Sequence, residues 1–254
     1  MSNAAGVDFS INYRSADYRL PVVLVHGAGG TRLHWPPALR RLPGYCVFAL
    51  DLPGHGKSPS PGVQTIAGYG RAVLAWLEAI KLERAVWVGH SMGSAICLWL
   101  ALEAPERVLG LGLLGAGARL RVHPDILQAA SSPQTFPAAV DLVMAWAFSP
   151  QASPRLVELA GRRMAETSQP VLHGDFLACD AFDLREQIQA VTQPSLIICG
   201  EQDRMTPARF ARWLAEQLPA ARLEILPHAG HMLMLEQPEA VANLLEIFLA
   251  EITP

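Results

Sequence analysis

The sequence has no run of lysines or arginines, and its 254 residues carry 20 basic against 23 acidic side chains. Such a near-neutral balance argues against binding to nucleic acid or to an acidic membrane surface, because both partners require a basic patch. Residues 1–20 also lack the apolar stretch of a secretory signal peptide. We therefore expect a cytoplasmic protein without a nucleic-acid partner.

Cysteine is scarce, with four in the chain and no pair at the CxxC or metal-ligand spacing. Free, buried thiols in a reducing compartment are the simplest expectation, and we predict no metal site. Residues 85–102 carry no Asp, Glu, Lys or Arg, and this uncharged run approaches the length of a membrane-spanning helix. Glycines, a histidine and a serine interrupt this run, so we interpret it as a strand, a turn and a helix and expect no stable membrane insertion.

The chain does contain short apolar runs that alternate with longer helical patterns. It is 51% hydrophobic and has the length of one α/β domain. Most of the runs are continuously apolar, as parallel strands covered on both faces require. The pattern predicts a doubly wound α/β sheet with helices on both faces. The expected strands are residues 7–13, 22–26, 46–50, 85–88, 108–114, 195–199 and 222–226.

One segment interrupts this alternation. Residues 119–185 have no convincing strand pattern and are punctuated by six prolines. We interpret the segment as a helical lid inserted into a core made of residues 1–118 and 186–254. Further along the chain, Thr206 before Pro207 predicts a helix that begins with a threonine cap.

Gly89-His90-Ser91-Met92-Gly93 follows an apolar strand and precedes a helical pattern. This G-x-S-x-G pattern is the nucleophile elbow, a turn so tight that its serine is strained and its flanking positions need glycine. The alternative is a glycine-rich turn with an incidental serine. A catalytic serine also requires a base, and that base requires an orienting acid.

Candidates for both roles follow the last two expected strands, at the same sheet edge as Ser91. Asp203 comes after residues 195–199, and His228 and His231 come after residues 222–226. The order serine, aspartate, histidine favours a catalytic triad. Glu201 and Asp51 are rival acids.

The chain resembles the α/β-hydrolase fold superfamily over almost its whole length, which implies a mostly parallel eight-stranded sheet with a helical lid. The motifs that carry the resemblance are His26-Gly27-Ala28-Gly29-Gly30, Asp51-Leu52-Pro53-Gly54-His55-Gly56-Lys57-Ser58, the elbow, Gly200-Glu201-Gln202-Asp203 and Gly230-His231-Met232. The resemblance implies that Ser91 is the nucleophile, Asp203 the acid and His231 the base. It assigns Asp51 to a structural turn.

The resemblance also implies an oxyanion hole made by the backbone N–H groups of Ala28 and Met92, and no cofactor. We expect a small-molecule ester with an apolar acyl group as substrate, while oligomeric state stays open. The expected substrate-binding residues are Gly27, Gly29, His90, Met144, Trp146, Phe148, Phe182 and Leu233. Two alternatives remain, a carbon–carbon bond hydrolase of the same fold and a ligand receptor with slow turnover.

Overall fold

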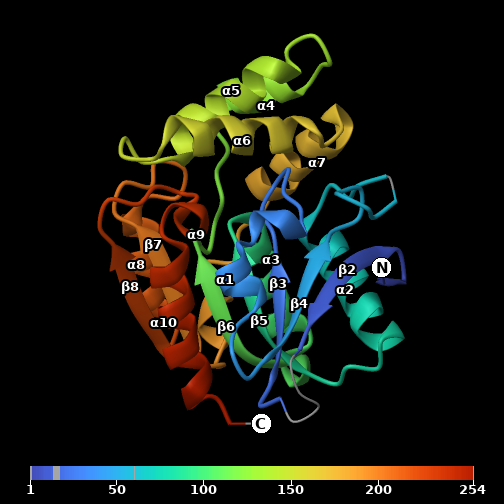
Figure 1. Ribbon diagram of the computed structural model, residues 1–254, viewed down its shortest axis with the longest axis vertical. Helices are drawn as coiled ribbons and strands as arrows, with labels where there is room; N and C mark the ends of the chain where they lie inside the picture. The colour runs from blue at the N-terminus through green and yellow to red at the C-terminus, as the bar shows by residue number, and fades with distance from the viewer. Residues whose placement is uncertain (1, 14–17, 60, 254) are drawn as a thin grey trace.

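The computed structural model describes residues 2–13, 18–59 and 61–253 of the chain (Figure 1). An eight-stranded sheet forms its centre, in the order β1-β2-β4-β3-β5-β6-β7-β8. Strands β3 to β8 run parallel, and β1 and β2 pair antiparallel at one edge. The expected eight-stranded, mostly parallel sheet is therefore confirmed. The strands are β1 Ser2–Ala4, β2 Val7–Asn12, β3 Pro21–Val25, β4 Cys46–Asp51, β5 Ala85–His90, β6 Val108–Leu114, β7 Ser195–Gly200 and β8 Ala221–Leu226.

Strand β1 is the one strand among the described residues that the apolar pattern did not predict. It is three residues long and largely exposed, so it carries no hydrophobic signal. A two-residue turn with positive φ at Ala5 (47°) and Gly6 (80°) joins it to β2. Such turns match the twist of paired antiparallel strands, which explains why a polar segment can pair here.

Helices cover both faces of the sheet because its central strands are apolar on both sides. Side chains of β3 alternate between two hydrophobic clusters, with Val23 and Val25 on one face and Val22 and Leu24 on the other. The first cluster includes α2 (Ile66–Ala79), α3 (Met92–Glu103) and α8 (Ala208–Gln217). The second includes α1 (Pro37–Arg40), α9 (Leu233–Glu236) and α10 (Pro238–Glu251).

Four helices between β6 and β7 form a separate layer above one edge of the sheet (Figure 1). Parallel strands end at the same edge, so the loops after β3, β5, β7 and β8 all open toward these helices. This arrangement leaves room for a site between the sheet and the helical layer. The four helices are α4 (Pro124–Ala130), α5 (Phe136–Ala147), α6 (Pro154–Ala165) and α7 (Gln169–Asp180).

The four cysteines are free and buried, as the sequence led us to expect. Burial raises the pKa of the Cys46 thiol to about 11 and also raises that of Cys179. Both thiols are therefore protonated and weakly nucleophilic near neutral pH. Within the described ranges, no helix has both the length and the hydrophobicity needed to cross a membrane.

Candidate active site

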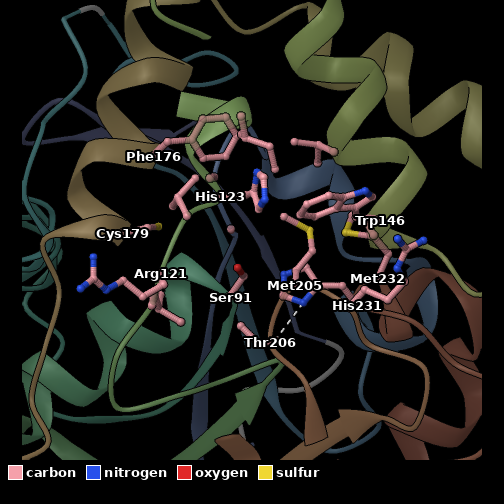
Figure 2. Close-up of a pocket in the computed structure, with 18 of the residues that line it drawn as sticks. Ser91, Arg121, His123, Trp146, Phe176, Cys179, Met205, Thr206, His231 and Met232 are labelled. Atoms are coloured by element: carbon pink, nitrogen blue, oxygen red, sulfur yellow. Dashed lines mark hydrogen bonds between the residues drawn. The ribbon is translucent and has the colours of Figure 1, made fainter. Parts of the chain in front are cut away.

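A cavity of about 510 Å³ lies between the sheet edge and the helical layer (Figure 2). Its lining comes from the loops that follow β3, β5, β6, β7 and β8 and from side chains of α4 to α8. Most of that lining is apolar, and a volume of this size is usual for small-molecule sites. Ser91 and His231 both face this space (Figure 2).

Ser91 stands at the turn from β5 to α3 with a backbone φ of 51° and ψ of −116°. A non-glycine residue rarely adopts a positive φ, and such strain marks functional turns. The flanking glycines allow the turn to close. A Cβ on Gly93 would come within 2.1 Å of the Val25 carbonyl oxygen, and one on Gly89 within 2.3 Å of the Gly93 oxygen.

Ser94 stabilises the elbow from the next turn of the chain. Its buried hydroxyl donates a hydrogen bond of 2.6 Å to the backbone oxygen of Ser91, which also accepts from the Ser94 N–H at 2.9 Å. On the other side, the Ser91 N–H donates to the oxygen of Leu114 in β6. These backbone contacts fix the strained residue without engaging its own side chain.

His231 and Asp203 form a buried pair, with 2.8 Å between His231 Nδ1 and Asp203 Oδ2. The Thr206 hydroxyl donates to the same carboxylate oxygen, and the N–H groups of Met205 and Thr206 donate to the other, each at 2.8 Å. Burial alone would raise the pKa of Asp203, but the His231 charge and these donors outweigh it, so the pKa is lowered. Asp203 is thus an ionised acceptor, and His231 Nδ1–H donates to it.

The rival acids lie elsewhere. Glu201 is exposed and accepts from the His228 N–H at 3.4 Å, while Asp51 bonds to Arg32. His228 is also exposed and lies outside the cavity lining. Of the three candidate acids, only Asp203 forms a hydrogen bond with His231 in the part of the chain that the structure describes.

The structure separates the expected substrate-contacting residues into two groups. Gly27, His90 and Trp146 line the cavity together with Ser91. Of the two expected oxyanion donors, Ala28 lines the cavity and Met92 lies outside the lining. The others lie outside this lining. Four of them belong to the hydrophobic cores on either side of the sheet, and the Gly29 N–H donates to the Asp175 carboxylate. Those outside are Gly29, Met144, Phe148, Phe182 and Leu233.

A buried carboxylate that the sequence analysis missed connects the helical layer to the loop after β3. Asp175 of α7 is fully buried and accepts hydrogen bonds from the Gly29 N–H at 2.8 Å, His55 Nε2 at 2.8 Å and the Tyr69 hydroxyl at 2.5 Å. Burial alone would lower the pKa of His55, but the Asp175 charge and hydrogen bond raise it overall. The available signal was an aspartate directly before the apolar Phe176 and Leu177 of α7, since a charge that is buried is almost always paired.

Replacing Asp175 with asparagine is expected to lower the free energy of unfolding by about 3 kcal/mol, because it leaves buried donors facing an amide NH₂. Urea denaturation followed by circular dichroism measures the change. Asp141→Asn is the matched control, since Asp141 is an exposed aspartate of the neighbouring helix α5. A destabilisation no larger in Asp175→Asn than in the control would contradict the expectation.

Three buried histidines should make the fold sensitive to acid. Burial, the largest cause in each case, lowers the pKa of His34 to about 4 and that of His90 to about 3, and lowers that of His26 well below its ordinary value. Unfolded chains take up these protons below about pH 6.5 while the folded chain does not. Their contribution to stability is thus present above pH 6.5 and is lost as the pH falls. His55 has a raised pKa, so its protonation favours the folded chain as the pH falls.

We therefore expect the free energy of unfolding to decrease as the pH is lowered from about 7 to about 4. Urea titrations at several pH values measure this slope. Replacing the buried His90 with glutamine should make the slope shallower, while replacing the exposed His228 with asparagine should leave it parallel to that of the native chain. Equal slopes in His90→Gln and the native chain would refute the assignment.

The chain is similar to a known protein family and to solved hydrolase structures. Residues 21–238 match the model of a family described as the alpha/beta hydrolase fold. A solved structure of a thermophilic esterase is 32% identical with a TM-score of 0.83, and the match covers 97% of this chain and 94% of that one.

Curated relatives differ in length and activity. The 3-oxoadipate enol-lactonase 2 of Acinetobacter baylyi is 29% identical, and the match covers 94% of this chain and 92% of that protein. Protein ABHD8 of Bos taurus is 28% identical over 93% of this chain, which spans 57% of that longer relative.

Proposed function

This chain belongs to the α/β-hydrolase fold family, and on that premise we propose that it hydrolyses carboxylic esters through an acyl-serine intermediate. The observation that supports this most directly is the buried 2.8 Å contact between Asp203 and His231, beside a cavity that strained Ser91 also lines. We assign Ser91 as nucleophile, His231 as general base and acid, and Asp203 as the group that orients His231.

In the proposed first half-reaction, His231 Nε2 takes the hydroxyl proton as Ser91 Oγ attacks the ester carbonyl carbon. The carbonyl π electrons move to oxygen, and Asp203 stabilises the imidazolium through Nδ1–H. The tetrahedral intermediate then collapses, its C–O bond breaks, and the alcohol leaves with the proton from His231. In the second half-reaction, His231 Nε2 takes a proton from water as the water oxygen attacks the acyl carbon. The tetrahedral intermediate then collapses, the bond from the acyl carbon to Ser91 Oγ breaks, and His231 returns the proton to Oγ as the carboxylic acid leaves.

We assign the oxyanion to the backbone N–H groups of Ala28 and Met92. Among the described residues, neither N–H donates a hydrogen bond within the protein, so both are free to donate to substrate. Met92 is also the first residue of α3, and a helix N-terminus favours negative charge. Loss of one such donor costs about 10²–10³ in rate. These proposed steps need no cofactor.

We expect substrates with a small or medium apolar acyl group. The cavity of about 510 Å³ is bounded by Trp146, Phe176 and other apolar side chains of the helical layer. We propose that residues 119–185 act as the lid of the site, and that Gly27, His90 and Trp146 contact the substrate. These assignments rest on the lining of the cavity.

A panel of p-nitrophenyl esters of graded acyl length, assayed on the native chain and on Ser91→Ala, tests the proposal. We expect repeated turnover with a maximum at two to six acyl carbons. A single burst of p-nitrophenol without further turnover would favour a ligand receptor. Cleavage of a vinylogous 1,5-diketone without ester turnover would favour a carbon–carbon bond hydrolase, and either result would overturn the ester assignment.

A further inference from the structure

Among the described residues, the Asp, Glu, Lys and Arg side chains that line the cavity are all positively charged. Three arginines are among the described residues that line it, Arg121, Arg204 and Arg209, and no aspartate or glutamate is. The chain as a whole has the opposite balance, with a net charge of −3. A cleft lined by charge of one sign raises the local concentration of ligands of the other sign.

Arg204 holds its charge at the boundary between the sheet and the helical layer. Its guanidinium carbon lies 5.7 Å from the ring centroid of Trp146, and Nη1 donates to the oxygen of Ala145 at 3.4 Å. Neither partner neutralises the charge, and among the described residues no carboxylate pairs with this arginine within 4.0 Å. Arg204 is exposed and lies beside Trp146, which also lines the cavity, so its charge is accessible to an anion that enters the cavity from solvent.

Arg209 and Arg121 also contribute positive charge to the lining. Arg209 belongs to the first turn of α8 and stacks at 4.9 Å on the ring of Phe210, again without a carboxylate partner among the residues described. Arg121 lies on the side of the cavity opposite Trp146 (Figure 2). Its contact with Asp180, at 4.0 Å, is long and leaves its charge only weakly compensated.

We infer that the ester substrate carries a carboxylate at the end of an apolar body, and that Arg204 and Arg209 bind this carboxylate. The inference deepens the proposed function and rests on it. An apolar lining with cations suits a ligand that buries its carbon chain and presents an anionic end. Arginine favours a carboxylate because its planar guanidinium can donate two parallel hydrogen bonds to the two oxygens.

Two esters of equal length test the inference: p-nitrophenyl hydrogen adipate, which carries a free carboxylate, and p-nitrophenyl adipamate, which carries a neutral amide. After subtraction of spontaneous hydrolysis, we expect the native chain to prefer the adipate by about tenfold in kcat/KM. The preference should arise mainly in KM, and it should weaken as salt is raised, because the Debye length is about 10 Å at 0.1 M.

Arg204→Gln and Arg209→Gln should each reduce this preference by about fivefold, whereas Arg204→Lys should retain part of it. A purely structural role would lower both rates together and leave their ratio unchanged. Arg162→Gln is the matched control, because Arg162 is exposed on α6, pairs with Glu158 and lies outside the cavity lining. Its ratio should equal that of the native chain.

Binding by the Ser91→Ala variant separates this inference from the proposed function. Calorimetry with adipate and with adipamide as ligands measures the charge preference without turnover. If neither ester is hydrolysed but adipate binds more tightly, the hydrolase assignment fails and the anion preference stands. If both esters are hydrolysed at equal rates, or if neither ligand is preferred, the carboxylate inference is overturned.

Discussion

Ser91→Ala is expected to lower kcat for p-nitrophenyl butanoate by about 10⁴-fold or more, because it removes the oxygen that forms the acyl bond. The remaining rate would come from the oxyanion donors and from substrate binding alone. Steady-state release of p-nitrophenol measures the loss. A variant that keeps one tenth of the native rate would exclude Ser91 as the nucleophile.

The fold should survive this substitution. The strained turn is fixed by backbone groups, since the Ser91 N–H donates to Leu114 and its carbonyl oxygen accepts from Ser94. Alanine retains both contacts. Ser94→Ala is the matched control, because it removes a neighbouring buried hydroxyl and one hydrogen bond worth about 1 kcal/mol. We expect that control to lose less than about tenfold in rate, which would separate the chemistry of Ser91 from the support of the elbow.

The sheet and the residues at its edge could be predicted because their signals are local. Continuous apolar runs identify parallel strands, and the loops that follow them must share one edge of the sheet. This reasoning alone places Ser91, Asp203 and His231 together. Their order along the chain and the glycines of the elbow then suggest the triad, which the structure supports at the Asp203–His231 contact.

Other features depend on contacts between distant segments and could not be predicted from local patterns. Asp175 accepts a hydrogen bond from the N–H of Gly29, which lies 146 residues away along the chain. The predicted threonine cap was wrong, because Pro207 is the N-cap of α8 and the Thr206 hydroxyl donates to Asp203 instead. Thr206 lies one residue before that N-cap, and its side chain is turned toward the Asp203 carboxylate.

The cavity lining was the least predictable part of the site. Met144 and Trp146 both belong to α5, yet only Trp146 lines the cavity, while Met144 packs into the core. An apolar residue on a helix fits either environment, and the choice depends on how the helix is rotated against its neighbours. Composition predicts an apolar cavity near these helices but does not identify the residues that line it.

Asp203→Asn is expected to lower kcat by about 10⁴-fold while preserving the geometry of the site. Oδ1 accepts from two backbone N–H groups, so the amide oxygen should occupy that side. The amide NH₂ would then face His231 Nδ1 in place of Oδ2. An amide N–H donates, which forces the imidazole proton onto Nε2, the atom required to accept the proton of Ser91.

Steady-state assays and thermal unfolding together distinguish this tautomer effect from a loss of structure. Glu201→Gln is the matched control, because Glu201 is an exposed acid on the same loop and does not contact His231. We expect its rate to stay near that of the native chain. Thr206→Val should give an intermediate loss, since it removes one donor to Oδ2 and leaves the carboxylate in place. If Asp203→Asn were as active as Glu201→Gln, another acid would have to orient His231 and the assignment of Asp203 would be wrong.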